Sequence, residues 1–372
     1  MRRLQTPLWL ARPTRFATLS HTGARIALAL IALLLAATSL AFDTPAPPAA
    51  SGDAAQRADD HADVVLYEGI VESMRHGGDY YTVAAAALRG GNYPLKPFVT
   101  FRLPTLAAVQ ALLPPAAVLA LLWTLCIAVA VAWHARLKPA FARAPPRIVA
   151  MVLLAGGLVM FVQPSLIAFH ELWAGLLIAL SLAVRMPGRW IEAAALGLAA
   201  MLVRETAALY VAAMACLAFA EGHRRESAGW AATLGVLALA VAAHAHAVAQ
   251  VVEPLDPASP GWAGMMGFGF FVRTMTITTA LTQAPLWLAA PLVGLALAGW
   301  AAWREPLALR AVTVFALYAA LLGVAGRVDT YYWGLLVAPT LLVGLAFAPD
   351  ALRDLLAAAL DRRRITVKRV VR

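Results

Sequence analysis

The feature that most constrains this chain is a series of apolar runs separated by short polar turns. A run of about 20 apolar residues is long enough for a helix to cross the hydrocarbon core of a bilayer. Charged residues make up only 13% of the chain, which is about half the share found in a typical soluble domain. The pattern therefore predicts an all-α polytopic membrane protein. No polar stretch is long enough to enclose a soluble core of its own.

The predicted organisation is a single transmembrane domain of about ten helices, residues 25–348, between two basic cytoplasmic segments, residues 1–24 and 349–372. Two long outer loops interrupt it, residues 43–113, in which we expect helices, and residues 253–283. The predicted spans are 25–42, 115–135, 148–162, 168–184, 190–203, 206–220, 230–251, 285–303, 311–326 and a tenth that ends near residue 348.

The charges predict the orientation of these spans. With both termini in the cytoplasm, 22 of the 30 lysines and arginines lie inside and 13 of the 20 acidic residues lie outside. This asymmetry is the positive-inside bias of membrane proteins. The net charge of +10 therefore reflects topology and requires no nucleic-acid partner. We expect a multi-pass protein of the inner (plasma) membrane, in contact with membrane lipids.

The first apolar run has an alternative interpretation as a cleaved signal peptide, because small residues such as Ala36, Ala37 and Ala41 follow its centre. Either interpretation places the next segment outside the cytoplasm. The two cysteines, Cys126 and Cys216, lie in apolar spans. They predict neither a disulfide nor a zinc site.

The first outer loop holds the longest polar stretch, with six carboxylates and four bases between residues 59 and 102. If residues 61–75 form a helix, Asp63, Tyr67, Ile70 and Met74 share one stripe. Asp63 then faces the membrane domain rather than water, which makes it our first candidate for a catalytic acid or base. Asp60 is the second candidate, although a favourable interaction with the helix dipole also explains an acid at that position.

Further along the loop, Asp79 and Tyr80 follow a Gly-Gly turn, and helix capping by Asp79 is as good an explanation as a role in a site. Two prolines then hold residues 92–98 extended, so Tyr93 and Lys96 are presented in fixed directions. A lysine placed in this way is a natural contact for phosphate. The alternative is a lysine that reaches to lipid headgroups.

Several charged residues of the other outer turns are candidates for the same site as the residues of this loop. Arg102, Arg204 and Arg327 are predicted on the outer side and would bind the phosphate of a substrate together with Lys96. A charge at bilayer depth costs about 2.5–3.5 kcal/mol on insertion scales. Arg204-Glu205 and His170-Glu171 are therefore candidates for a substrate cavity, together with Tyr67, Asp79, Tyr80 and Tyr93. A self-satisfied ion pair is the alternative for Arg204-Glu205.

Three motifs of the first outer loop resemble those of the GT-C glycosyltransferases. They are Asp63-x-x-x-Tyr67, Gly78-Asp79-Tyr80 and Lys96-Pro97-Phe98, in this order. The nearest branch is that of the aminoarabinose transferases and protein mannosyltransferases, with its D-E-x-x-Y, G-D-[WY] and K-P-P motifs. The likeness covers about forty residues, whereas the topology is similar over the whole chain. Val64 replaces the second acid and Phe98 replaces a proline.

The resemblance implies a GT-C-like fold and a catalytic role. Asp63 would contact the acceptor or a metal, and Lys96 would contact the phosphate of a polyprenyl-phosphate sugar, so we expect the two side chains to share one cavity. A divalent cation, with Asp63 as its ligand, is a possible cofactor. The expected function is transfer of a sugar to a glycan, lipid or protein acceptor on the extracytoplasmic face, with inversion. The alternatives are a transporter or flippase of a lipid-linked glycan and a non-catalytic assembly subunit.

Overall fold

The computed structural model describes residues 6–45 and 54–361, and within the second range it describes side chains from residue 63 onward. The described residues form helices and no strand, as the apolar runs predicted. The predicted catalytic role of Asp60 and the predicted basic segment after residue 361 concern side chains that lie outside this description.

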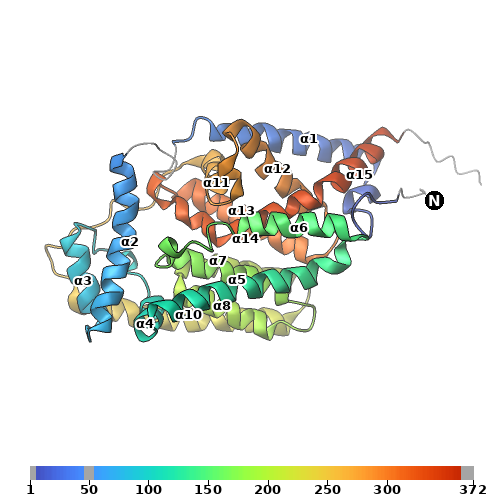
Figure 1. The fold of residues 1–372 in the computed structure, drawn as a ribbon. Coiled ribbons are helices and arrows are strands. Elements are labelled where there is room, and N and C mark those ends of the chain that lie inside the picture. The colour runs from blue at the N-terminus through green and yellow to red at the C-terminus, as the bar shows by residue number, and fades with distance from the viewer. Residues whose placement is uncertain (1–5, 46–53, 362–372) are drawn as a thin grey trace, which may run out of the picture.

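The long helices run roughly parallel and form an elongated bundle, with α2 standing upright across one end (Figure 1). We call this end, which carries α2, α3 and α4, the α2 end, and the opposite end the α15 end. The principal helices are α1 (His21–Ala37), α2 (Ala54–Arg75), α3 (Tyr80–Gly90), α4 (Thr105–Leu112), α5 (Pro115–Leu137), α6 (Ala144–Gly157), α7 (His170–Val184), α8 (Ile191–Val203), α9 (Ala208–Ala220), α10 (Arg224–Val251), α11 (Gly267–Ile277), α12 (Leu286–Ala302), α13 (Pro306–Ala325), α14 (Ala338–Leu341) and α15 (Ala348–Leu360).

Helical segments coincide with all ten predicted spans, but their lengths differ. Four stretches of the described chain are long and apolar enough to cross a membrane: His21–Ala41, Pro115–Ala140, Arg224–Val251 and Pro306–Ala325. A fifth is added if Val328–Leu336 and Ala338–Ala346, which meet at an angle of 59°, form one broken span. The others, such as α7 and α8, are shorter apolar helices. The structure therefore supports a membrane-embedded helical protein, and the count of ten spans stays a prediction.

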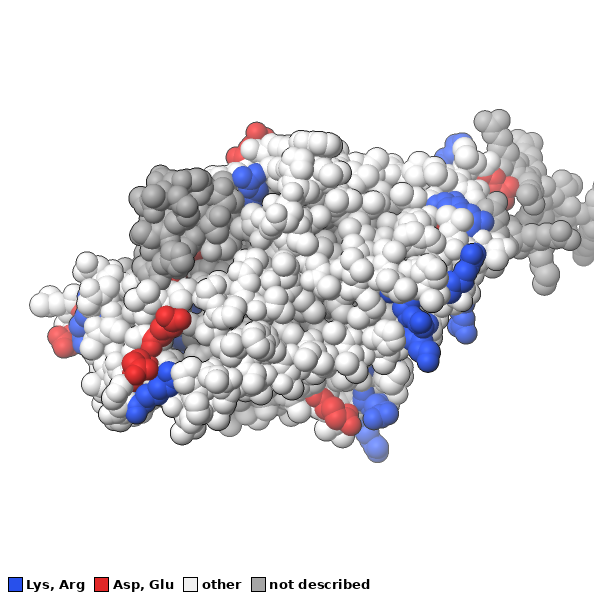
Figure 2. All heavy atoms as spheres, viewed as in Figure 1, with Lys and Arg blue, Asp and Glu red and all other residues white. Residues whose placement is uncertain are grey.

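Charged side chains are sparse along the middle of the bundle on the face shown in Figure 2. Lysines and arginines gather at the α15 end, and acidic residues lie together with basic ones near α2 (Figure 2). A wide uncharged belt between two charged ends is the surface that a bilayer requires.

Local sequence explains where several helices begin. Asp79 accepts a hydrogen bond from the Thr82 backbone N–H and so caps α3. Proline occupies the first position of α5 and α13, where a missing N–H costs nothing. These signals are local, which is why the sequence alone identified most boundaries.

Close packing of the bundle depends on small residues. Gly299 of α12 lies against the 3₁₀ helix Leu342–Ala346, and a Cβ at Gly299 would come within 1.9 Å of the Gly344 carbonyl oxygen. Glycine at such crossings lets two backbones touch, as is common between membrane helices. The contact fixes the segment after the 59° bend against α12.

The segment predicted as a basic tail from residue 349 begins as part of the bundle. In α15, Asp350 accepts hydrogen bonds from the backbone of Leu8, Trp9 and Leu10. Asp354 accepts two from Thr14. Both carboxylates are buried. Residues 349–360 therefore hold the N-terminal segment in place, because these carboxylates satisfy backbone groups that have no helical partner.

Candidate functional site

Helix α2 presents the first candidate residues to the bundle, as its periodicity predicted. Ile70 is buried, and Tyr67 and Met74 pack against the same hydrophobic cluster. Asp63 lies on this stripe and is half-buried, whereas Glu68 and Glu72 on another face of α2 are exposed. The predicted orientation of Asp63 is confirmed.

The environment of Asp63 favours a role as a base. Burial raises the pKa of the Asp63 carboxyl, and the nearby charges of Glu171 and Asp329 act in the same direction. A hydrogen bond from the Tyr93 hydroxyl and the charge of Arg102 act against this shift without cancelling it. A carboxylate with a raised pKa accepts a proton more readily once it is ionised.

Two arginines, Arg102 and Arg204, approach the same carboxylate, that of Glu171, in what we call the arginine site. Arg204 follows α8 and is almost fully buried, with 4% of its surface exposed. Its guanidinium is 2.5 Å from Glu171 Oε1 and 2.9 Å from Glu205 Oε2. Glu205 also accepts a hydrogen bond from the backbone N–H of Leu103. The pair Arg204-Glu205 is thus part of a larger cluster rather than self-satisfied.

Arg102 has a different set of partners. Its Nε donates to the Tyr67 hydroxyl at 3.1 Å, and a terminal nitrogen lies 3.4 Å from the Tyr332 hydroxyl. The nearest carboxylate oxygen, on Glu171, is 3.9 Å away. Tyr80 donates a hydrogen bond to the Arg102 carbonyl and fixes the backbone. Because its closest partners are neutral phenols, Arg102 is the less neutralised of the two arginines.

A cavity of about 300 Å³ opens beside both arginines. Polar groups of Arg102, Arg204 and Glu205 line it together with aromatic rings of Trp262, Tyr332 and Trp333. Sequence reasoning did not identify these rings as site residues. For Tyr332 and Trp333, the available signal was their position shortly after Arg327-Val-Asp329. The remaining lining residues are Val99, Thr206 and Thr330.

His170 lies behind the arginine site at the start of α7. Its ring packs edge-on against Tyr67 at 5.2 Å, and only 4% of its surface is exposed. Neither ring nitrogen has a hydrogen-bond partner among the described residues. Buried polar atoms normally have one, so His170 has unused capacity to bind a substrate group. A small internal hollow borders His170, Tyr67 and Gln110.

The expectation that Lys96 shares a cavity with Asp63 is wrong in this structure. Lys96 Nζ donates to the Pro254 carbonyl at 2.9 Å, and its backbone pairs with the second outer loop through Pro257 and Ser259. The extended backbone around Pro97 was predicted, but the partner that it pairs with was not. That pairing directs the lysine toward residues 254–259 and away from the arginine site.

Two other candidates have local partners. Arg327 binds Asp329 at 3.0 Å and approaches the Gly261 carbonyl, and it does not line the cavity. Asp79 caps α3 with its exposed carboxylate, so capping accounts for it. The described residues contain no group of three or more His, Cys, Asp or Glu side chains arranged to hold a metal ion. Asp63 as a single ligand therefore stays a prediction.

No protein-family model matches the chain, and no curated protein or solved structure matches it either. The function is therefore inferred from the geometry and chemistry of the site itself.

Proposed function

We propose that this protein is an inverting glycosyltransferase that moves a sugar from a polyprenyl-phosphate donor to an acceptor at the α2 end. The observation that carries the proposal is a cavity lined by Arg102 and Arg204, with the half-buried Asp63 carboxyl, whose pKa is raised, within the electrostatic influence of Arg102. The order of the loop motifs around Asp63 and Gly78-Asp79-Tyr80 supports it. The outer face of the inner membrane is the proposed location of this end.

The chemistry assigns a role to each group. The acceptor hydroxyl oxygen forms a bond to the anomeric carbon while the bond between that carbon and the phosphate oxygen breaks. Asp63 takes the hydroxyl proton, and the phosphate leaves with the bonding electron pair. Arg102 and Arg204 stabilise the charge that develops on the phosphate. No step requires a metal ion, and a chelator titration of activity tests whether one contributes.

Arg102 takes the role that the resemblance gave to Lys96. Glu171 and Glu205 already neutralise Arg204, whereas the phenols of Tyr67 and Tyr332 orient Arg102 without opposing its charge. A guanidinium also matches phosphate geometry through two parallel hydrogen bonds.

The test is transfer by the purified protein in lipid nanodiscs with a panel of synthetic polyprenyl-phosphate sugars, measured as release of polyprenyl phosphate. Loss of the base in Asp63→Asn should lower the rate by about 10²–10⁴-fold. Asp43→Asn is the matched control, since Asp43 is an exposed aspartate of the same region. Full activity in Asp63→Asn with an active donor would remove Asp63 from the mechanism.

A second candidate function, movement of a lipid-linked glycan across the membrane, is favoured by one observation. The 59° bend between Val328–Leu336 and Ala338–Ala346 makes a broken helix, and its first half carries Tyr332 and Trp333 into the cavity. Broken helices of this kind line substrate sites in many transporters. Transport of the intact lipid-linked sugar in vesicles, without release of polyprenyl phosphate, would support this function over transfer.

A further inference from the structure

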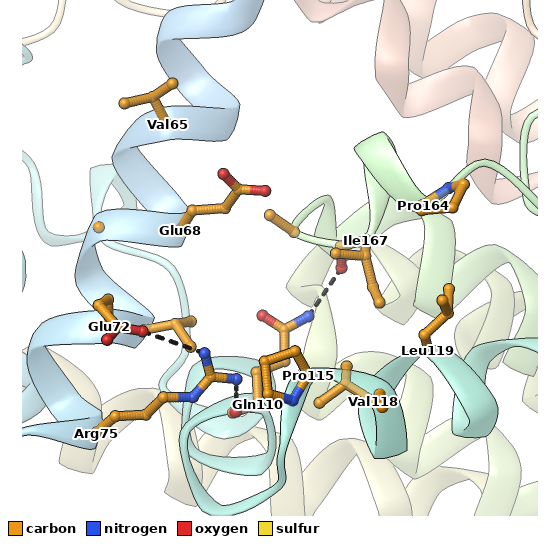
Figure 3. Close-up of a pocket in the computed structure, with 14 residues that line it drawn as sticks. Val65, Glu68, Glu72, Arg75, Gln110, Pro115, Val118, Leu119, Pro164 and Ile167 are labelled. Atoms are coloured by element: carbon orange, nitrogen blue, oxygen red, sulfur yellow. Dashed lines mark hydrogen bonds and ion pairs between the residues drawn. The ribbon is translucent and has the colours of Figure 1, made fainter.

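A second and larger hollow lies between α2 and the start of α5 (Figure 3). We call it the lateral groove, and its volume is about 690 Å³. Most of its wall is apolar. The apolar lining residues are Val65, Gly69, Val71, Pro115, Ala116, Val118, Leu119, Pro164, Ile167 and Ala168.

Opposite charges lie along one side of the groove. Glu68, Glu72 and Arg75 come from successive turns of α2. Figure 3 shows the Glu68 carboxylate pointing across the groove toward the segment that carries Pro164 and Ile167. Glu68 has no ion-pair or hydrogen-bond partner among the described side chains, whereas Glu72 binds Arg75 at 3.2 Å.

Arg75 is held at the end of the groove. One terminal nitrogen donates to the backbone carbonyls of Gln110 and Leu113, and the other faces Glu72. These bonds leave part of the five-donor guanidinium for another anion. The groove thus offers a carboxylate that has no partner among the described side chains and, further along α2, a fixed cation.

The position of the groove indicates which molecules reach it. α5 is one of the four helices long enough to span a bilayer, and the groove contacts its first residues. α2 stands across this end of the bundle (Figure 1). The charged side of the groove therefore lies at headgroup depth, and the wall formed by Val118 and Leu119 lies toward the hydrocarbon.

We propose that the lateral groove binds a membrane phospholipid whose headgroup carries a primary amine. The ammonium group lies between Glu68 and Glu72, the phosphate contacts Arg75, and an acyl chain follows the apolar wall along α5. An anionic lipid without an amine is disfavoured, since it would place negative charge near two carboxylates. This inference is independent of the proposed transferase activity.

Native mass spectrometry of the purified full chain tests the proposal. The probes are dioleoyl phosphatidylethanolamine and dioleoyl phosphatidylglycerol, which have the same acyl chains and differ in the headgroup. Retention of the ethanolamine lipid should exceed that of the glycerol lipid. Glu68→Gln should weaken it by at least about tenfold, the expected loss of one charge-assisted hydrogen bond. Glu192→Gln, at an exposed glutamate that begins α8, is the matched control.

A second variant separates headgroup recognition from the groove itself. Ala116 is exposed and lines the groove, so Ala116→Trp fills the space without removing a buried side chain. It should abolish retention of both lipids while the protein keeps its elution volume and helical circular dichroism. Equal retention of the two lipids by the unmodified protein would overturn the proposal. Unchanged ethanolamine-lipid binding in folded Glu68→Gln or Ala116→Trp protein would overturn it as well.

Discussion

Two ion clusters built around buried arginines lie at opposite ends of the bundle, and they use the same residue types differently. At the α15 end, Arg185 binds Glu226 through two bonds of 2.8 Å, and Arg310 binds Glu221 through bonds of 2.8 and 2.5 Å. Each arginine of this closed cluster therefore has its own carboxylate in a two-bond pair. In the arginine site only Arg204 is closely paired with carboxylates. The closest partners of Arg102 are the hydroxyls of Tyr67 and Tyr332.

The two clusters also differ in whether their arginines border a cavity. Arg185 and Arg310 are 2% and 0% exposed, whereas both arginines of the arginine site line a cavity. A cluster in which each buried arginine has its charge balanced by its own carboxylate stabilises an arrangement of helices and leaves little net positive charge for an anionic ligand. An incompletely paired arginine beside a cavity can bind an anion. The closed cluster is therefore suited to a structural role, and the arginine site is the better candidate for binding the substrate of the proposed reaction.

The largest expected effect concerns the closed cluster. Arg185→Ala leaves the Glu226 carboxylate buried without its partner, which should cost about 3–5 kcal/mol of unfolding free energy. Thermal unfolding in detergent measures it, with exposed Arg189→Ala at the same end as the control. Near-native stability of Arg185→Ala would contradict a structural role for this cluster.

The next effect concerns the arginine site. Arg102→Gln removes a positive charge without leaving a closely paired carboxylate behind, so the stability loss should be smaller than that of Arg185→Ala. Sugar transfer should fall by about 10²–10³-fold, as for loss of one group that stabilises the transition state. Rate and unfolding temperature are measured on the same preparation. A large loss of stability with an unchanged rate per folded molecule would reverse the comparison.

The pH dependence of stability should further distinguish the α2 end, which carries Asp63, from the α15 end. Because the pKa of Asp63 is raised in the folded protein, the native state binds more protons than the unfolded state between the ordinary and the raised pKa. The contribution of Asp63 to stability therefore falls as pH rises through that window, and Asp63→Asn should raise the unfolding temperature at neutral pH. At a pH below the ordinary pKa of an aspartate, the difference in unfolding temperature between Asp63→Asn and the unmodified protein should vanish.

The rate of sugar transfer should also depend on the ionisation of Asp63, but it should rise with pH where the stability contribution falls. The rate of the unmodified protein should rise with pH as Asp63 ionises, because only the carboxylate accepts a proton. A rate that is independent of pH across this range, with chemistry rate-limiting, would exclude Asp63 as the base.

The smallest expected effect is that of Lys96→Ala. Its ammonium bonds a backbone carbonyl of the second outer loop at the partly exposed surface. Removal should change stability by about 0.5 kcal/mol or less, and the transfer rate by less than about threefold. A loss of activity as large as that of Arg102→Gln would return the phosphate-binding role to Lys96.

The sequence alone determined the features that depend on neighbouring residues. The apolar runs identified the helices, the stripe of Asp63, Tyr67 and Ile70 oriented α2, and Asp79 was recognised as a possible cap. Periodicity and capping act within one or two turns, so they are legible without knowledge of the fold.

Only the tertiary structure decided which distant groups meet. Arg102, Glu171, Arg204 and Tyr332 are separated by up to 230 residues, and the bundle brings their side chains into contact. The same packing paired Leu95 and Lys96 with residues 257–259 and so took Lys96 out of the site. No local pattern encodes such contacts, because they depend on how helices cross and on which loop lies beside an exposed strand-like segment. Composition thus determined that the protein is helical and membrane-like, and long-range packing determined which arginine beside the cavity lacks a closely paired carboxylate.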